Sequence, residues 1–258
     1  MKKDWNAPRT RADVEAQIFD GYLEKDDETQ QRRNLALLLQ ECAFAEHIPI
    51  YCAIDAEYIS AEDRKAMQLA ADGVGGDFQV RGGIILGENI REMFLFAEQG
   101  IPETHGIRYT TAAELVTENY MLHFREVLET QGYHTALIMP DVLPDPELSK
   151  LMASSGKGAA GSNGRFIAGA YGAKVCCGLV LTDAPLMGGD YRFPDYPSDV
   201  CGDCRLCVDA CPAGALSMDR SFVRDLCLAY RNDPENQEEV DEYTVRKCMR
   251  CMEVCPAR

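Results

Sequence analysis

The chain has 258 residues, 46% of them hydrophobic, and a formal net charge of −16 from 42 acidic and 26 basic residues. This length is enough for a full-sized core and predicts one or two domains. The acidity makes nucleic acid an unlikely partner, because phosphate contacts need Lys and Arg. The sequence contains no run of about 18 apolar residues, so we expect no membrane span. The opening Met1-Lys2-Lys3-Asp4-Trp5 has no apolar signal segment, so we expect a cytoplasmic protein.

Strand and helix patterns alternate over the first 185 residues or so, which predicts an α/β domain. Apolar residues at helical spacing and capping residues predict helices over 9–46, 61–71, 89–98, 112–129 and 145–154. We expect Asn89 to cap the third of these, and Thr110 or Thr111 the fourth. Short apolar runs predict strands over 48–54, 83–87, 134–139 and 175–181.

Four cysteines lie in this first part of the chain: Cys42, Cys52, Cys176 and Cys177. In a reducing compartment, single cysteines of this kind are usually buried and inert. Strand alternation places Cys176 and Cys177 on opposite faces, so they are not expected to ligate one metal together. A redox sensor that uses one of these two thiols is the weakest of the functional alternatives.

A glycine-rich loop over 156–164 follows the last predicted helix, and residues 188–198 are typical of a linker. We therefore expect an α/β domain over 1–190 and a small second module over 191–258. Gly156 to Gly161 matches G-x-G-x-x-G. That fingerprint needs a strand before it, whereas the preceding segment has a helical pattern, so a plain tight loop is favoured over a dinucleotide site.

The second module contains eight cysteines. Cys201-x2-Cys204-x2-Cys207-x3-Cys211-Pro212 is followed by Cys227 and then by Cys248-x2-Cys251-x3-Cys255-Pro256. Each run resembles a bacterial ferredoxin motif, in which three close thiolates bind one 4Fe-4S cluster and the fourth ligates the other cluster. Two clusters need eight ligands, and the second run lacks its first cysteine. Cys227 would have to supply that ligand through a loop.

The crossing rule assigns the ligands to two sets. One cluster would take Cys201, Cys204, Cys207 and Cys255, and the other would take Cys211, Cys227, Cys248 and Cys251. Zinc is a poorer interpretation, since the first run is too crowded for one tetrahedral ion. Disulfides would need an oxidising compartment. The motif therefore predicts a protein that moves electrons.

A wider string of motifs resembles the epoxyqueuosine reductase and reductive dehalogenase families over roughly residues 130–258. In those families a glycine loop precedes a strand ending in T-D-x-P-L, and a two-cluster module follows. Here the loop is Ser155 to Gly164 and the strand ends in Thr182-Asp183-Ala184-Pro185-Leu186. The long gap between Cys227 and Cys248 is also similar to theirs.

The resemblance implies a nitroreductase-like, cobalamin-binding α/β domain, followed by a ferredoxin-like module whose clusters pass electrons to the corrinoid. The loop positions that match the families are Gly156, Gly158, Gly161, Asn163 and Gly164, where small residues would let the backbone approach a large cofactor. The loop departs from the families at Lys157, Ala159, Ala160 and Ser162. Neither Asp141 nor Asp145 aligns cleanly with the catalytic aspartate of epoxyqueuosine reductases, so no catalytic residue is assigned.

We therefore expect an iron–sulfur oxidoreductase that relays low-potential electrons through two 4Fe-4S clusters to a corrinoid-type cofactor. The alternative is an electron-transfer or accessory protein that has neither a bound corrinoid nor a substrate of its own. Either function implies a redox partner, such as a ferredoxin or flavodoxin-like donor. A small-molecule substrate belongs to the first function only.

Overall fold

The computed structural model describes residues 28–90, 94–97, 109–140, 143–188, 196–219, 221–241 and 244–257. Of the helix expected over 9–46, residues 9–27 lie outside the described part of the chain, and the remainder forms the helix Glu28–Ala45. A four-stranded sheet forms the centre of the fold, with the order β1-β2-β8-β5 and antiparallel pairing throughout. Its strands are β1 (Ile50–Asp55), β2 (Gly82–Asn89), β5 (Thr135–Ile138) and β8 (Val175–Thr182). All four lie where the sequence predicts strands.

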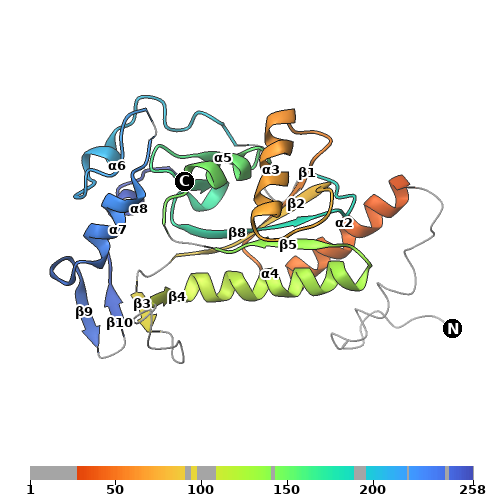
Figure 1. Cartoon of the computed structure of the whole chain (residues 1–258), viewed down its shortest axis with the longest axis horizontal. Coiled ribbons are helices and arrows are strands. Elements are labelled where there is room, and N and C mark those ends of the chain that lie inside the picture. Colours follow the sequence, from red (N-terminus) through yellow and green to blue (C-terminus); the bar gives the residue numbers. More distant parts are fainter. Residues whose placement is uncertain are drawn as a thin grey trace.

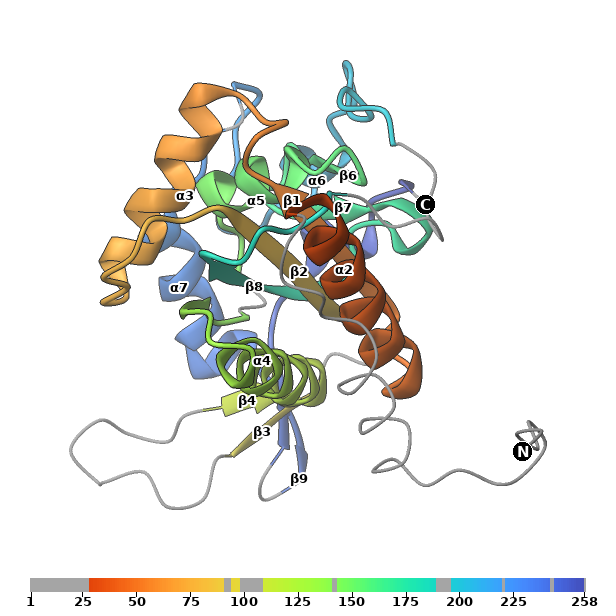
Figure 2. The ribbon, with the colours of Figure 1, turned by 90° about the vertical axis from the view of Figure 1, so that its right-hand side faces the viewer.

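Helices cover both faces of this sheet (Figures 1 and 2). Helices α2 (Glu28–Ala45) and α4 (Ala112–Thr130) pack on one face, and α3 (Ala61–Gly73) and α5 (Pro146–Ala153) pack on the other. Side chains alternate between the two faces of the sheet along β2. Ile84 and Leu86 face the first pair of helices, while Ile85 faces the second. The chain thus folds as a three-layer α/β/α sandwich around an antiparallel sheet.

Three helices begin at side-chain caps. Ser60 caps α3 and Asp145 caps α5. Thr111 forms a full capping box with Glu114 at the start of α4, which confirms one of the two caps expected there. No helix among the described residues is long and apolar enough to cross a membrane.

The helix expected over 89–98 is wrong. Asn89 ends strand β2, and the next described segment is strand β3 (Phe94–Ala97). A second sheet has the order β4-β3-β10-β9. Strand β4 (Tyr109–Thr111) comes soon after β3 in the chain, whereas β9 (Glu238–Asp241) and β10 (Thr244–Arg246) belong to the cysteine-rich end of the chain. Strand β3 pairs with β10, Leu95 opposite Val245, so a long-range partner overrides the local helical pattern.

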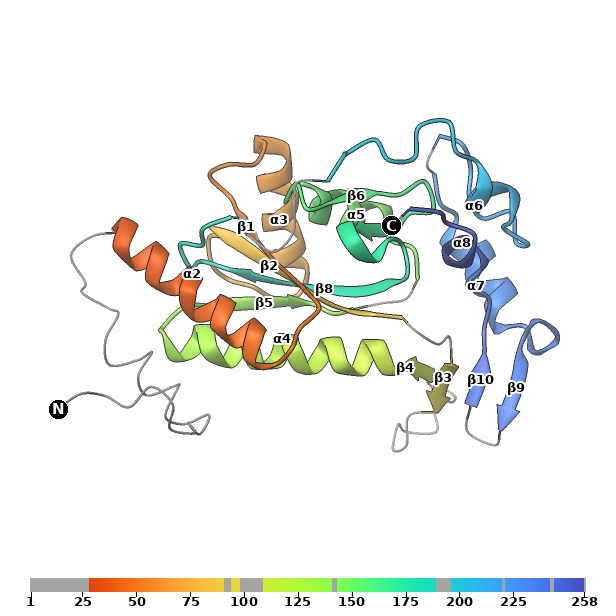
Figure 3. The same ribbon diagram turned by 180° about the vertical axis from the view of Figure 1, so that it is seen from behind.

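The cysteine-rich module lies at one end of the central sheet (Figures 1 and 3). It contains α6 (Leu206–Asp209), α7 (Arg224–Asn232), the 3-10 turn η3 (Pro234–Asn236) and α8 (Arg250–Glu253). The expected domain boundary near 190 falls among residues 189–195, outside the described part of the chain. The β3–β10 pairing crosses that boundary, so the two parts share a sheet.

The glycine-rich segment forms a small hairpin beside α5. Strands β6 (Gly158–Ala160) and β7 (Phe166–Ala168) pair with each other, and the 3-10 turn η2 (Gly169–Tyr171) follows them. The expected plain loop therefore contains a short strand. Farther on, Cys177 packs in the core under α3 and α5, while Cys176 packs with Met249 and Met252 of the module. The expectation that these two thiols face opposite sides is confirmed.

Candidate functional site

Short helices and loops present the eight cysteines of the module. Cys207 lies on α6, Cys227 on α7 and Cys251 on α8, and the other five occupy loops around these helices. Cys207 and Cys251 are each the second residue of their helix, and Cys227 is the fourth residue of α7. All eight are half-buried except Cys207, which is buried.

One group of thiols gathers around α6. Burial, followed by the thiolates of Cys201 and Cys255, raises the pKa of Cys207 to about 11. Burial also raises the pKa of Cys255, with further contributions from Cys201 and Cys204. These interactions indicate that Cys201 lies near both Cys207 and Cys255, and that Cys204 lies near Cys255. They are the four that the crossing rule places in one set, and Cys255 reaches them from the far end of the module.

A second group gathers between α7 and α8. Burial raises the pKa of Cys227, and the thiolates of Cys211 and Cys248 raise it further against the opposing charge of Arg231. Burial raises the pKa of Cys251 to about 12, opposed by Arg165 and reinforced by Cys227, by Cys248 and by Cys207 of the first group. Cys211, Cys227, Cys248 and Cys251 all line one cavity. The distant Cys227 is thus beside the thiols that the second run provides.

This arrangement fits a cubane in each group. A 4Fe-4S cluster needs four thiolates spread around a body larger than a single metal ion. Backbone amides also face the sulfurs, since Ala215 N donates to Cys211 Sγ at 3.3 Å and Ser162 N donates to Cys201 Sγ at 3.3 Å.

The glycine-rich loop contacts both groups. Ser162 reaches Cys201, and the side-chain amide of Asn163 donates to the carbonyl oxygen of Cys251 at 3.3 Å. Asn163 Oδ1 in turn accepts from the backbone N–H of Arg165 at 3.1 Å. The loop is therefore the joint between the α/β domain and the cysteine module.

Close contacts within the chain, or a positive φ, explain why glycine is needed at three positions of the loop. A Cβ at Gly158 would meet Ile167 O and the Phe166 ring at 2.4 Å, and one at Gly161 would meet Asn163 Oδ1 at 2.5 Å. Gly164 has a φ of +69°, which favours glycine. Gly156, with a φ of +72°, has open space around its Cβ position. The close approach of a cofactor that was expected at these glycines stays a prediction.

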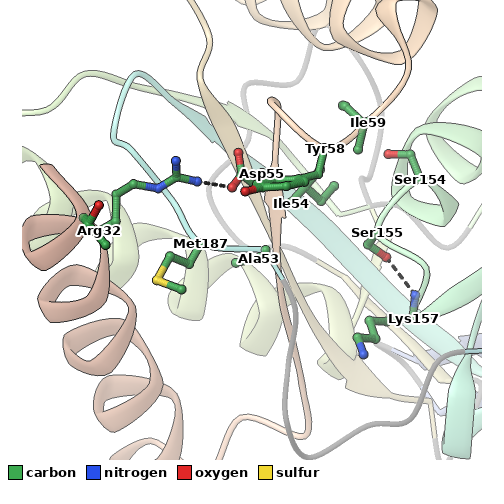
Figure 4. A pocket seen from close by; sticks show the side chains of 12 residues that line it. Arg32, Ala53, Ile54, Asp55, Tyr58, Ile59, Ser154, Ser155, Lys157 and Met187 are labelled. Atoms are coloured by element: carbon green, nitrogen blue, oxygen red, sulfur yellow. Dashed lines mark hydrogen bonds and ion pairs between the residues drawn. The ribbon is translucent and has the colours of Figure 1, made fainter.

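A cavity of about 600 Å³ opens beside this loop, between α2, β1 and the end of α5 (Figure 4). Arg32 of α2 points across it to Asp55 at the end of β1, and Ser155 and Lys157 lie on the opposite wall. Arg32 forms ion pairs with Asp55 and Glu57. Burial raises the pKa of Asp55, although the backbone N–H of Glu57 and the charge of Arg32 oppose the shift. The volume is within the usual range of about 300 to 1,000 Å³ for cofactor pockets.

Tyr196 connects this cavity to the first thiol group. Its backbone N–H donates to Gly156 O at 2.9 Å, next to Lys157 in the cavity wall. Burial raises the pKa of Tyr196, and the thiolates of Cys255 and Cys201 raise it further. Tyr196 is therefore bonded to the loop beside Lys157 and also lies within the electrostatic reach of Cys255 and Cys201.

Sequence reasoning did not single out Tyr196, Arg231, Arg165 or the Arg32–Asp55 pair. Arg231 had a local signal, because it lies four residues after Cys227 on a helix and so shares its face. The other three are brought to the site by contacts between distant segments, for which the sequence contains no comparable pattern.

Comparisons with known proteins agree with this description. Residues 200–258 match the family model of a 4Fe-4S double cluster binding domain. The module is therefore of the class that binds two 4Fe-4S clusters, as its cysteine spacing predicts.

Epoxyqueuosine reductases are the relatives that the sequence and the fold both resemble. That of Listeria monocytogenes is 32% identical over 46% of this chain and 32% of its own length. The structure of epoxyqueuosine reductase from Streptococcus thermophilus has a TM-score of 0.53 at 18% identity, covering 87% of this chain and 66% of that one. Another, crystallised with an epoxyqueuosine-modified tRNA-Tyr stem loop, has a TM-score of 0.52 at 16% identity, covering 87% of this chain and 65% of that one.

The resemblance to epoxyqueuosine reductases inferred from the motifs is confirmed. The matched segment spans about a third of the length of the curated relative. The α/β part and the module share the fold of these reductases.

Proposed function

We propose that this protein is an iron–sulfur oxidoreductase that passes electrons through two 4Fe-4S clusters to an acceptor bound in the Arg32–Lys157 cavity. The observation that carries the proposal is the match of residues 200–258 to a 4Fe-4S double cluster binding domain, together with four cysteines that line one cavity. In this proposal Cys201, Cys204, Cys207 and Cys255 bind cluster one. Cys211, Cys227, Cys248 and Cys251 bind cluster two.

The acceptor that the family resemblance suggests is a corrinoid, in a nitroreductase-like domain. When bound, such a cofactor supplies the reductive chemistry, and the protein positions it and adjusts its electronic properties. Lys157, Ser155 and the Arg32–Asp55 pair would contact its polar groups. Gly156 and Tyr196 support cluster one as the nearer electron donor, because they join the cavity wall to the Cys201 group.

The test is a titration of anaerobically reconstituted protein with hydroxocobalamin. Dithionite-reduced clusters are mixed with the corrinoid, and absorbance and cobalt electron paramagnetic resonance are recorded. Stoichiometric binding with an altered cobalt signal is the expected result. Lys157→Glu, which reverses the charge of the wall, should weaken binding while leaving about eight irons per chain. The exposed Lys65→Glu on α3 is the matched control.

An electron carrier without a bound corrinoid is the alternative. It would show both clusters and no cobalamin binding, and the clusters would still reduce a partner protein. The departures of the loop at Lys157 and Ser162, and the internal contacts of Gly158 and Gly161, favour this alternative.

A tRNA substrate is a second candidate, because a similar structure contains a modified tRNA stem loop. The formal net charge of −16 weakens electrostatic attraction to phosphates. Binding of a tRNA anticodon stem loop, measured by fluorescence anisotropy at low and at physiological salt, decides this candidate. We expect no saturable binding at physiological salt.

A further inference from the structure

Arg231 is a buried cation in the wall of the cavity formed by the second thiol group. It is 7% exposed and lies on α7, one turn after Cys227. Its Nη1 donates to the carbonyl oxygen of Cys248 at 2.9 Å and approaches Met249 Sδ at 3.5 Å. The same cavity is lined by Cys211, Cys227, Cys248 and Cys251. The guanidinium is therefore fixed beside the place of cluster two.

Arg165 is a second buried cation, and it approaches from the α/β domain. It is 5% exposed, and its Nη2 donates to the carbonyl oxygen of Val175 at 2.6 Å. Its backbone N–H donates to Asn163, whose side chain donates to Cys251 O. Burial raises the pKa of Cys251 and of Cys177, and the charge of Arg165 opposes both shifts. Two arginines from different parts of the fold thus face the same thiol group.

The first thiol group has different surroundings. Burial has the largest effect on the pKa of Cys207 and of Cys255. The next largest effects on these pKa values come from other thiolates and from backbone amides. Ser162 N donates to Cys201 Sγ and Ala215 N donates to Cys211 Sγ, each at 3.3 Å. Further backbone amides act on Cys207 and Cys255 of the first group. Among the described residues the buried cations are Arg165 and Arg231, and their hydrogen bonds lead to Cys251 and Cys248 of the second group.

We propose that Arg165 and Arg231 hold cluster two at a higher reduction potential than cluster one, so that the first electron entering the protein resides on cluster two. This inference rests on the proposed function. A one-electron reduction adds one negative charge to a cluster, and a fixed cation in a poorly solvated site stabilises that charge. Exposed Arg224 and Arg250 and half-buried Lys247 lie on the same side, and solvent screens the exposed charges more strongly.

The test is an anaerobic redox titration with dithionite, followed by electron paramagnetic resonance of the reduced clusters. Cys204→Ala removes a cluster-one ligand and so identifies the signal of cluster two. Arg231→Met and Arg165→Met should each move the cluster-two midpoint to a more negative potential and leave the cluster-one midpoint in place. Arg231→Lys keeps the charge and should remain close to the original midpoint.

Arg246→Met is the matched control, because it removes the same charge from an exposed position of the same module. It should move neither midpoint. If both clusters assemble and neither methionine variant shifts cluster two, or if cluster one is the first to be reduced, the inference is wrong. If the unaltered protein assembles no clusters, the proposed function itself fails, which the iron content reports separately.

Discussion

The side-chain amide of Asn163 donates a 3.3 Å hydrogen bond to the carbonyl oxygen of Cys251, a residue 88 positions farther along the chain. The carbonyl group of the same side chain accepts from Arg165 N. Its neighbour Ser162 donates to the sulfur of Cys201. One loop of the α/β domain therefore contacts both thiol groups and sets the position of the cysteine module.

Replacing Asn163 with Ala should loosen this joint. The substitution removes two hydrogen bonds at a residue that is 1% exposed, which costs about 1 to 3 kcal/mol for each buried group left without its partner. We expect faster amide hydrogen exchange over residues 248–257 and faster iron release to a chelator. Asn119→Ala, which removes an exposed side-chain contact to Leu115 on α4, should change neither rate. Unchanged exchange in the Asn163 variant would contradict the role of the loop.

Replacing Arg32 with Met should destabilise the α/β domain in a pH-dependent way. Asp55 is 4% exposed and would lose its cationic partner, at a cost of roughly 2 to 4 kcal/mol near neutral pH. Burial already raises the pKa of Asp55 in the folded state, and removal of Arg32 should raise it further. The folded variant then binds a proton more tightly than the unfolded chain, so its stability increases as the pH falls.

Urea unfolding followed by circular dichroism under anaerobic conditions measures this effect. The free energy of unfolding of the Arg32 variant should be lower than that of the original protein. This difference should shrink as the pH is lowered from about 7.5 toward 5. Lys65→Met, at an exposed position on α3, provides the control for loss of one positive charge. A difference that grows on acidification would show that the Arg32–Asp55 pair is not its source.

Cys176 and Cys177 should be chemically inert in the folded protein. Burial raises the pKa of Cys177 to about 12, so at pH 8 roughly one thiol in ten thousand is the reactive thiolate. Cys176 is also buried. Iodoacetamide labelling, mapped by mass spectrometry, should modify half-buried Cys42 before either of them. Rapid labelling of Cys176 or Cys177 would instead support the redox-sensor alternative.

The sequence predicted the central sheet and the double-cluster module because both depend on short-range patterns. Apolar runs mark β2 and β8, and ferredoxin spacing marks the thiols. Strand β3 was missed because its partner β10 is about 150 residues away, and only that pairing makes Phe94–Ala97 a strand. The antiparallel order of the sheet likewise depends on tertiary packing.

The contacts that join the two parts of the protein were also outside the reach of the sequence. Asn163 matched a family motif, and this match suggested a cofactor contact. Its observed partners are Cys251 and Arg165, which a pattern of glycines does not specify. Arg165 and Arg231 are charged residues in the interior, and sequence statistics place such residues at the surface.

In the proposed arrangement, Cys227 completes the second of two crossed cluster sites. The most direct measurement is the iron content and Mössbauer spectrum of anaerobically reconstituted Cys227→Ala, compared with the original protein and with Cys42→Ala. We expect about eight irons in the original protein and in the Cys42 variant, and about four in the Cys227 variant, with cluster one intact. Two complete 4Fe-4S clusters in Cys227→Ala would contradict this arrangement.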